Sequence, residues 1–395
     1  MNPSQVQRVH LYPLAIPLRQ TFSHAAAERR TADPVVVAVE LRTGHVGYGE
    51  TLPREYVTGE TVSSVIEDIA RRLLPGVERW HPSSFAEALE LTDALPYRRD
   101  DGRLMLAARA GLELALLDAY SRHFRRPVSE AAGWLGLPGF GPPGSIRTVR
   151  YSGVLSAGDP AKLRGLVRKM RWFGLRDFKL KVGFEDDDRR VRTVVDALGP
   201  SLGRKTTLRL DANGGWSVET AVRRLTAWSS LPIACIEQPL PRGQERHVRD
   251  LCVAAPFPIM QDESLLTYED AEAMILQGAM DILNIRISKN GGLLPAMRLA
   301  GLARQKKLRF QLGCLVGETS ILSAAGRRFL ECVPGAMFAE GSYGRFLLRG
   351  DIAARPLCFG YGGRVKALAG FGWGVQVNPS ALTSYCADDA VELTL

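Results

Sequence analysis

The feature that most constrains the fold of this chain is an alternation of strand and helix patterns that begins near residue 146. Eight short apolar runs follow one another at intervals of roughly 25–30 residues, the length of a βα unit. The expected strands span residues 147–155, 177–183, 206–212, 233–239, 258–263, 281–287, 308–314 and 336–341. Eight strands with crossover helices, and no Rossmann glycine fingerprint, predict a closed (β/α) barrel. An open doubly wound sheet is the alternative.

The segments between these strands have the apolar periodicity of helices. Residues 191–198 and 218–225 each place valine, alanine or leucine side chains on one helical face. Thr267 is expected to cap a further helix at its N-terminus, and Gly278 is expected to end that helix. The pattern therefore supplies the crossover helices that a parallel sheet needs.

The residues that precede the barrel predict a separate α+β unit. Residues 6–18 contain two prolines and are typical of an edge strand, whereas residues 35–41 and 46–50 are expected to pair as a hairpin. Residues 104–124 are apolar on most sides, which predicts a buried helix. Residues 19–33 are polar without a clear period, so we expect a long loop there, of the kind that is usually functional or disordered.

These patterns divide the chain into three parts. We expect a capping domain at residues 1–132, and a barrel that carries the site at residues 145–355. We also expect a C-terminal return at residues 356–395 that packs on the capping domain. The turn-rich stretch at residues 133–144 separates the first two parts.

Composition restricts the possible partners and location. The net charge is +9, but the basic residues are spread out and do not alternate with aromatic residues, so a nucleic-acid partner is not expected. No run of about 18 uninterrupted apolar residues occurs, which argues against a membrane span. Six scattered cysteines without a CxxC pair are typical of reduced thiols. With no secretion-signal pattern at the N-terminus, they predict a cytoplasmic protein.

The apolar runs between residues 178 and 292 end in charged side chains. In a barrel, the C-terminal ends of the strands together form one mouth, where the chemistry takes place. Three carboxylates close the third, fourth and fifth strands, and lysines lie on the second strand and after the sixth: Asp211, Glu237, Asp262, Lys179, Lys181 and Lys289. The second and sixth strands are four steps apart in a ring of eight, so the two lysine sites are expected to face each other.

The three carboxylates predict a metal site. Any one of them alone is more often a solvated loop residue or an ion-pair partner, but three successive strands that all end in a carboxylate are rarely due to chance. Asp211, Glu237 and Asp262 offer only oxygen donors, with no histidine or cysteine nearby. Such a site favours Mg²⁺, with Mn²⁺ as the second choice. Asn213 is expected to support a ligand or a bound water by a hydrogen bond.

A metal ion between two lysine sites indicates a particular reaction class. A lysine acts as a base when its pKa is pulled towards neutrality, and Lys179 supplies a like charge beside Lys181. The metal would stabilise the anion formed from a substrate carboxylate, while a lysine on either face removes or returns the α-proton. This chemistry permits racemisation, epimerisation, β-elimination and cycloisomerisation.

The motifs KLKVG, DANGGW, IEQP, DES (262–264) and SKNGG occur in this order along the chain. Together they resemble the enolase superfamily and, within it, the subgroup of muconate-lactonizing enzymes. The resemblance covers the whole chain and implies an α/β fold, a modified (β/α)7β barrel with an N-terminal α+β capping domain. It implies Mg²⁺ ligands at Asp211, Glu237 and Asp262, an acid/base pair at Lys181 and Lys289, a tuning role for Lys179, and a supporting acid at Glu263.

The resemblance says less about the substrate. Its subgroup includes muconate cycloisomerase, o-succinylbenzoate synthase, N-succinylamino-acid racemase and dipeptide epimerase. The leading hypothesis is a Mg²⁺-dependent, muconate cycloisomerase-like isomerase that acts on a small carboxylate as a homo-oligomer. The alternatives are a dipeptide or N-acylamino-acid epimerase or racemase, and an o-succinylbenzoate synthase-like dehydratase. From a different class, the chain is a barrel that binds an anionic ligand without catalysis, although a binder has no need of two opposed lysines.

Candidate substrate contacts come from the same resemblance. Residues 19–33 correspond to a lid loop, and residues 53–60 to a second contact from the capping domain, which makes Arg54 and Tyr56 candidates. After the eighth strand, dipeptide epimerases carry an Asp-x-Asp pair that holds the substrate amine. Here residues 339–348 contain one acid, Glu340, which weakens the epimerase hypothesis for ordinary dipeptides. Glu318 lies one residue later than the acid of the subgroup's seventh strand, and it is a further candidate.

Overall fold

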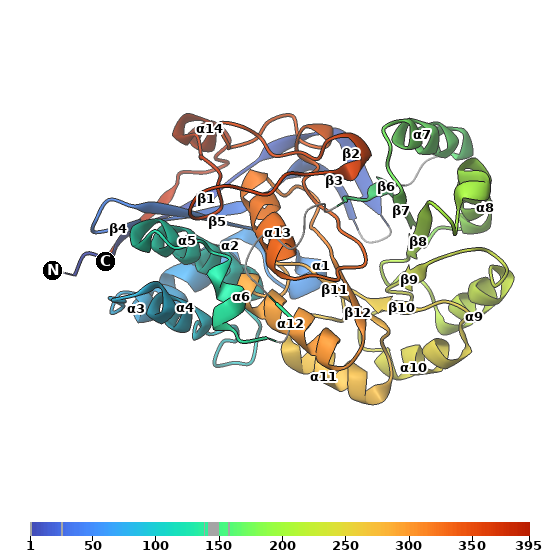
Figure 1. Cartoon of the computed structure of the whole chain (residues 1–395), viewed down its shortest axis with the longest axis horizontal. Coiled ribbons are helices and arrows are strands. Elements are labelled where there is room, and N and C mark those ends of the chain that lie inside the picture. The colour runs from blue at the N-terminus through green and yellow to red at the C-terminus, as the bar shows by residue number, and fades with distance from the viewer. Residues whose placement is uncertain (1, 25–26, 138, 141–149, 157–158) are drawn as a thin grey trace.

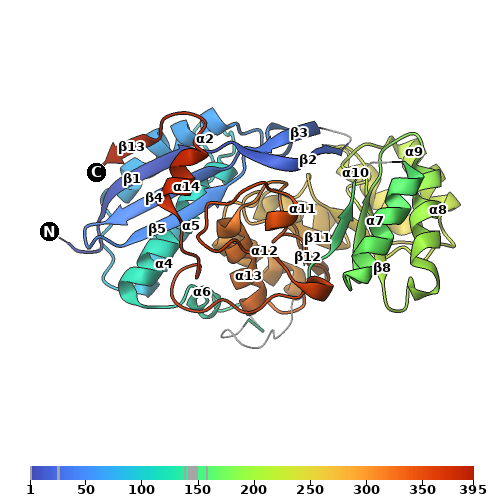
Figure 2. The ribbon, with the colours of Figure 1, turned by 90° about the horizontal axis from the view of Figure 1, so that it is seen from above.

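The computed structural model describes residues 2–24, 27–137, 139–140, 150–156 and 159–395. Two units lie side by side in it (Figures 1 and 2). One is a cap made of an antiparallel sheet with helices against it, and the other is a ring of parallel strands with helices outside it. The architecture is the modified (β/α)7β barrel with an α+β cap that the sequence predicted.

The cap is built on a four-stranded antiparallel sheet, in the order β13-β1-β4-β5. Its strands are β1 (Val6–Pro13), β4 (Val35–Leu41), β5 (Val46–Thr51) and β13 (Val391–Thr394). The predicted hairpin of residues 35–41 and 46–50 is confirmed, with Val36 opposite Glu50 in the register of β4 and β5. β13 pairs with β1 at the edge of the sheet, so the end of the chain returns to the cap.

Helix α5 (Leu106–Phe124) covers one face of this sheet at unusually short range. A Cβ atom on Gly47 would lie 2.1 Å from the backbone nitrogen of Ala119, and one on Gly49 would lie 2.0 Å from the carbonyl oxygen of Gly111. Only glycine fits at either position of β5, because a side chain there would meet backbone atoms that cannot move aside. The helix is buried from Leu106 to Ser121, as the sequence predicted.

Residues 19–24 and 27–32 belong to two paired strands, so the prediction of a long loop was wrong. Strands β2 (Ile16–His24) and β3 (Ala27–Ala32) pair antiparallel, and residues 25–26 of the predicted loop lie outside the described part of the chain. The pair of strands β2 and β3, called the β2–β3 ribbon, is hydrogen-bonded to a segment of the barrel side. Arg19 N donates to Leu347 O at 2.8 Å, and Arg349 N donates to Pro17 O at 2.9 Å. The β2–β3 ribbon therefore projects from the cap across towards the barrel (Figure 2).

The remaining cap helices are short. They are α1 (Glu55–Thr58), α2 (Val62–Asp68), a π-helical turn at Ile69–Leu73, α3 (Leu74–Val77), α4 (Phe85–Asp93) and α6 (Glu130–Trp134). A capping box starts α2, because Thr61 Oγ1 accepts from Ser64 N and Ser64 Oγ accepts from Thr61 N. α1 places Tyr56 at the edge of the cap that faces the barrel cavity described below.

Seven parallel strands form the wall of the barrel, in the order β12-β11-β10-β9-β8-β7-β6. They are β6 (Gly153–Leu155), β7 (Asp177–Lys181), β8 (Thr207–Asp211), β9 (Cys235–Glu237), β10 (Ile259–Gln261), β11 (Ile282–Ile285) and β12 (Arg309–Leu312). Each lies within a predicted strand, although residues 147–149 of the first prediction fall outside the described residues.

The eighth predicted strand, at residues 336–341, is not a regular strand. Ala339 instead forms parallel bridges to both Leu312 and Tyr151, the two ends of the seven-stranded sheet. Glu340 N donates to Leu312 O at 2.8 Å, and Ser152 N donates to Ala339 O at 2.9 Å. The ring is therefore closed, which excludes the open doubly wound sheet.

Helices surround the ring. They are α7 (Pro160–Trp172), α8 (Asp187–Leu198), α9 (Val218–Ala227), α10 (Glu245–Ala254), α11 (Tyr268–Gln277), α12 (Leu293–Gln305) and α13 (Ser320–Cys332). The predicted ends of α11 are confirmed: Thr267 Oγ1 accepts from Asp270 N at 3.2 Å, and Gly278 adopts a left-handed conformation with φ 67°. No helix among the described residues is long and apolar enough to cross a bilayer.

Two buried carboxylates of the cap join it to the barrel. Glu50 accepts from the backbone N–H groups of Thr319 and Leu322, at 2.7 and 2.9 Å, where α13 begins. Glu113 on α5 accepts in the same way from Leu293 and Leu294, where α12 begins. Each carboxylate binds N–H groups that the first turn of a helix leaves without partners, so the cap supplies the N-caps of two barrel helices.

Candidate active site

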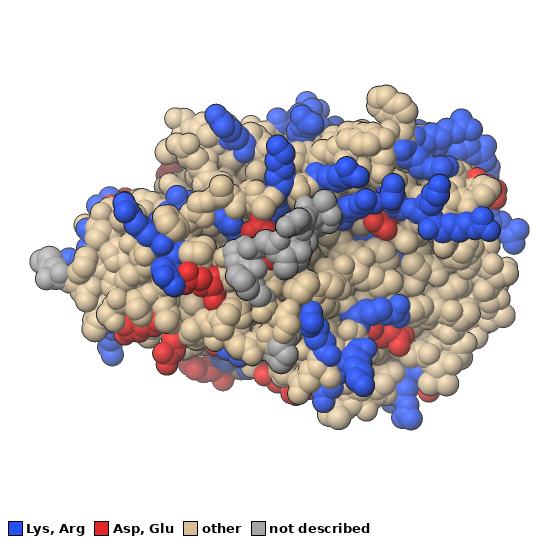
Figure 3. Space-filling model, in the orientation of Figure 1, with Lys and Arg blue, Asp and Glu red and all other residues tan. Residues whose placement is uncertain are grey.

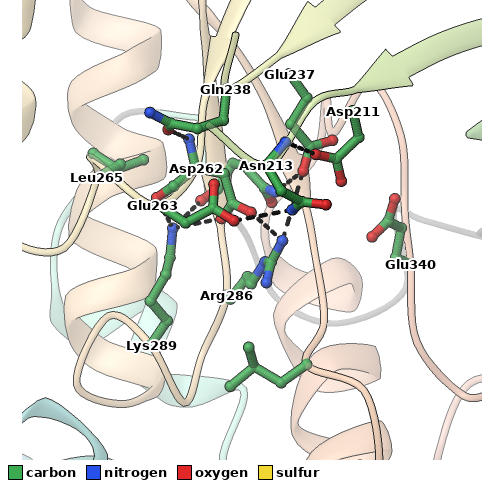
Figure 4. Close-up of polar contacts among 12 residues, drawn as sticks. Asp211, Asn213, Glu237, Gln238, Asp262, Glu263, Leu265, Arg286, Lys289 and Glu340 are labelled. Carbon is green, nitrogen blue, oxygen red and sulfur yellow. Dashed lines mark hydrogen bonds and ion pairs between the residues drawn. The ribbon is translucent and has the colours of Figure 1, made fainter. Parts of the chain in front are cut away.

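The register of neighbouring strands brings the charged residues into one row at the mouth of the barrel. Lys181 on β7 pairs with Asp211 on β8, and Asp211 pairs with Glu237 on β9. Asp262 follows directly after β10, the next strand in the ring. Because these strands are parallel, their C-terminal ends meet at one rim, and the three carboxylates form an arc there (Figure 4).

The lysines of β7 hold one end of the arc. Lys181 Nζ lies 2.6 Å from Asp211 Oδ2 and donates to Asn213 Oδ1 at 2.8 Å. Lys179 Nζ lies 3.1 Å from Asp211 Oδ2 and 3.3 Å from Glu237 Oε1. Burial acts to lower the pKa of Lys179, but the surrounding carboxylates outweigh it and hold that pKa well above its ordinary value. Lys179 therefore remains charged beside Lys181.

Lys289 lies at the other end of the arc and is completely buried. Its Nζ lies 3.0 Å from Asp262 Oδ1 and donates to the carbonyl oxygens of Asp262 and Asn284, at 2.6 and 3.0 Å. Burial lowers its pKa, Arg286 adds to the effect, and Asp262 opposes it. The two lysine sites thus flank the arc, because Lys181 contacts Asp211 and Lys289 contacts Asp262. Figure 4 shows Lys289 reaching Asp262.

Arg286 was not among the residues predicted for the site. It follows β11, and its guanidinium forms an ion pair with Asp262 and lies 3.6 Å from Glu237 Oε1. The available signal was the alternation in NIRIS, where asparagine, arginine and serine share the face opposite to the isoleucines. Asn284, on the same face as Arg286, donates from Nδ2 to Glu237 Oε1 at 2.8 Å.

Two further residues orient the arc. Asn213 accepts from Lys181, and its Nδ2 donates to Glu263 Oε1 at 3.0 Å, so it links a candidate base to a second carboxylate. Gln238 was also missed by the sequence analysis, although it lies in the IEQP motif. Its Oε1 accepts from Asp262 N at 2.9 Å and fixes the backbone from which that carboxylate projects.

The donor set suits a hard divalent cation, although the side chains are paired with one another in this structure. No group of three or more His, Cys, Asp or Glu residues in the described part of the chain is arranged to hold a metal ion as it stands. The carboxylate oxygens instead form ion pairs with four cationic side chains, those of Lys181, Lys179, Arg286 and Lys289. All three arc carboxylates are fully buried, and Glu263 Oε2 nearby is buried without a hydrogen-bond partner. Oxygen donors of this kind fit Mg²⁺.

A cavity of about 750 Å³ opens above the arc. Part of the cavity floor is formed by Lys179, Lys181, Glu263 and Arg286. Tyr56 lines the cavity from the cap. The volume lies within the range of about 300–1,000 Å³ that is usual for small-molecule sites. The structure therefore brings both β7 lysines and Glu263 to a space in which a substrate fits.

Of the four candidate substrate contacts, Tyr56 and Glu340 line the cavity, whereas Arg54 and Glu318 are not among its lining residues. Arg54 is 1% exposed and is held by Asp33 Oδ1 at 2.8 Å and the carbonyl oxygen of Val316 at 2.9 Å, away from the cavity. Glu318 lines a separate small cavity behind the floor, and burial raises its pKa to about 8. Glu340 reaches the floor, but it is occupied by ion pairs with Lys179 and Arg209.

Comparison with known proteins agrees with the fold. Residues 162–381, more than half of the chain, match the family model described as enolase C-terminal domain-like. The chain is 27% identical to muconate cycloisomerase 1 of Rhodococcus opacus, over 98% of this chain and 99% of that protein. It is also 27% identical to a hydrophobic dipeptide epimerase of Enterococcus faecalis, over 80% of this chain and 84% of that protein.

A solved structure shows the same fold with a bound metal. The dipeptide epimerase from Cytophaga hutchinsonii, complexed with Mg and the dipeptide D-Ala-L-Val, superposes with a TM-score of 0.84. The two chains are 23% identical, and the match covers 99% of this chain and 100% of the other. The relatives named here are all isomerases. This chain is thus an enzyme of the enolase C-terminal domain-like family and belongs to the muconate-lactonizing subgroup of the enolase superfamily.

Proposed function

We propose that this chain is a Mg²⁺-dependent isomerase that removes and returns the proton α to the carboxylate of a small substrate, in a muconate cycloisomerase-like reaction. The observation that carries the proposal is the arc of Asp211, Glu237 and Asp262, which has Lys181 at one end and Lys289 at the other. A structural ion-pair network alone has no need to bury three carboxylates and two lysines at the mouth of a barrel.

Asp211, Glu237 and Asp262 are the proposed metal ligands. Neighbouring carboxylates already contact the same cationic side chain. Lys179 contacts Asp211 and Glu237, and Arg286 contacts Glu237 and Asp262. A bound Mg²⁺, or Mn²⁺ as the second choice, supplies positive charge that makes the α-proton of a carboxylate substrate more acidic. Glu263, with one buried oxygen that has no partner, is the proposed support for this site.

Lys181 is the proposed base on one face of the substrate. Its Nζ lines the cavity and is oriented by Asp211 and Asn213, so it is held at the place where an α-proton would lie. Lys179 provides a permanent positive charge beside it. Lys289 is the proposed partner on the other face. Its counter-ion is Asp262, one of the proposed metal ligands, so the same carboxylate would hold the metal and orient the amine.

A second candidate reaction is the racemisation or epimerisation of an N-acylamino acid. A free substrate amine needs an acidic partner, and Glu340 is already occupied by Lys179 and Arg209. This observation favours substrates without a free amine over ordinary dipeptides. A dehydration like that of o-succinylbenzoate synthase, which also begins with removal of a proton α to a carboxylate, is the alternative at the same site.

The test is α-proton exchange in D2O, followed by NMR over a library of carboxylic acids with Mg²⁺ present. We expect Lys181→Ala and Lys289→Ala each to reduce exchange by about 10²–10⁴-fold, the usual contribution of a positioned acid or base. Lys162→Ala, an exposed lysine on α7, is the matched control and should retain full activity.

Full activity in either site variant would refute the two-base mechanism. Net conversion of an exchanging acid would identify cycloisomerisation or dehydration, whereas exchange with inversion alone would identify a racemase. If no acid exchanged and EDTA left ligand affinity unchanged, a binding barrel without catalysis would replace the proposal.

We further propose that the enzyme is a cytoplasmic homo-oligomer. All six cysteines are free in the described structure, which suits a reducing compartment. Light scattering of the purified protein would report its oligomeric state, and a purely monomeric mass would refute that part of the proposal. Cell fractionation would test the location.

A further inference from the structure

The cavity above the arc is larger than a compact diacid requires. Its volume of about 750 Å³ lies in the upper part of the range for drug-sized ligands. The polar floor occupies one part of the lining, namely Lys179, Lys181, Glu263 and Arg286. The remainder of the space extends away from the reacting groups, so it is available to a part of the substrate that does not react.

Apolar side chains from two segments line this remaining space. Leu166, Met170 and Phe173 belong to α7 or follow it directly, and Phe346 and Leu347 come from the segment after the ring closes. We call the space between them the apolar cleft. The rings of Phe173 and Phe346 lie 5.7 Å apart, and Phe359 extends the same cluster, 5.1 Å from Phe346. These edge-on and tilted contacts give the cleft a rigid aromatic wall.

Large apolar side chains are exposed where the cleft opens. Trp172 is 84% exposed and Phe346 is 45% exposed, and both line the cavity together with the exposed Leu166. Exposed apolar side chains that cluster around a cavity mark a place where another apolar group binds, because such a patch is unfavourable in water. Continuity with the lysines at the floor identifies that group as part of the substrate.

The charges along the cavity restrict the chemistry of this group. The acidic side chains that line the cavity are Glu263 and Glu340, and both belong to the floor. Lys169 lines the cleft, and Lys and Arg side chains are frequent at the end of the molecule where α7 lies (Figure 3). A cationic group in the cleft would therefore have no counter-ion and would meet like charge.

We propose that the substrate carries, in addition to its reacting carboxylate, a bulky neutral apolar or aryl group that fills the apolar cleft between α7 and residues 343–359. This inference rests on the proposed function, because the carboxylate end is placed at the arc. The cleft then selects the substrate by burying apolar surface, and it rejects compounds that end in an ammonium group.

Three N-acyl-L-alanines provide the test, since all share the carboxylate and the α-proton. Their acyl groups are acetyl, heptanoyl and 6-aminohexanoyl, and the last two have the same length but end in methyl and ammonium respectively. With Mg²⁺ present, binding is measured by calorimetry and α-proton exchange by NMR in D2O. Each buried methylene contributes about fourfold, so we expect the heptanoyl compound to bind at least tenfold more tightly than either of the others.

Two variants assign the effect to the cleft. Trp172→Ala and Phe346→Ala remove exposed wall residues and should abolish most of the preference for heptanoyl-alanine over acetyl-alanine. Leu276→Ala, an 86% exposed apolar residue on α11 that does not line the cavity, is the control. A preference that persists in both wall variants would overturn the assignment to this cleft.

The outcomes separate the two proposals. Equal binding and exchange of all three compounds would overturn the apolar cleft and leave the acid/base function intact. A heptanoyl preference without exchange of any compound would support the cleft and count against the acid/base function. If no compound bound and none exchanged its α-proton, both proposals would be overturned. Equal affinity for the compounds that end in ammonium and in methyl would refute the charge argument.

Discussion

Arg286 forms ion pairs with two of the three carboxylates that we propose as metal ligands. Its guanidinium contacts Asp262 and Glu237, where positive charge is needed if the carboxylates are to stay ionised out of water. A divalent cation at the arc would replace part of this charge. Arg286 and a metal ion at the proposed site would therefore compete for the same oxygens, and the arginine would stabilise the arc without the metal.

Replacing Arg286 by methionine tests this competition. We expect Arg286→Met to lower the melting temperature of the metal-free protein, because two buried carboxylates lose a partner. We expect it also to tighten Mg²⁺ binding by about tenfold or more, because a like charge at about 4 Å costs at least ~1 kcal/mol and 1.4 kcal/mol is about tenfold in affinity. Titration calorimetry and thermal unfolding with and without Mg²⁺ give both quantities. Arg209→Met, whose partner Glu340 is not a proposed ligand, serves as the comparison, and weaker Mg²⁺ binding by Arg286→Met would contradict the idea.

The residues that sequence reasoning placed correctly are those at strand ends. Asp211 and Glu237 stand where an apolar run stops, so strand geometry alone brings them to one rim. Arg286 was missed because an arginine inside a polar alternation is usually exposed. The position of Arg54 could not be predicted from the sequence either. Its partners, Asp33 and the carbonyl oxygen of Val316, come from segments far apart in the chain.

At the scale of elements, the contact between β5 and α5 depends on glycine. We expect Gly49→Ala to destabilise the protein by about 3 kcal/mol or more, because the new Cβ would lie 2.0 Å from the carbonyl oxygen of Gly111. Gly133→Ala in α6 is the matched control, since nothing lies within 4 Å of its Cβ, and alanine favours a helix by up to about 1 kcal/mol. Urea denaturation measures both variants. Equal stability of the two would mean that the helix and strand separate easily.

Elements with one buried face were predictable, and elements without one were not. The segment VVVAVEL (35–41) became β4 as expected, because its valines belong to the core. The ribbon of β2 and β3 has no comparable apolar alternation, so its polar sequence indicated a loop. Residues 336–341 complete the ring through bridges at Ala339, a contact too short to have a strand pattern.

At the scale of the whole molecule, the joint between cap and barrel depends on pH. Burial raises the pKa of both Glu50 and Glu113 from 4.5 to about 7. Arg109 beside Glu113, and the backbone N–H groups that both carboxyls bind, only partly oppose this rise in pKa. The folded state therefore favours the protonated carboxyl. The stability that each contributes is fully present below a pH of about 4.5 and is lost as the pH rises through about 7.

We expect the free energy of unfolding to fall as the pH rises from about 5 to about 8, by up to about 3 kcal/mol for each of these carboxyls. Glu50→Gln keeps a neutral side chain at every pH, so its curve should be flatter over this window. Urea denaturation at several pH values measures the slope, with the exposed Glu90→Gln of α4 as the control. A slope in Glu50→Gln equal to that of the unmodified protein would remove Glu50 from the explanation.

The pairing of β13 with β1 means that the sheet of the cap can be completed only late in the synthesis of the chain. Residues 391–394 leave the ribosome after the entire barrel, yet they complete the sheet that begins at Val6. Until then β1 has an open edge, which is a template for pairing with another chain. The barrel can close at Ala339 while the cap still lacks its last strand. A nascent chain can therefore close its ring before its cap is finished, and during this interval the edge of β1 is open to pairing with another chain.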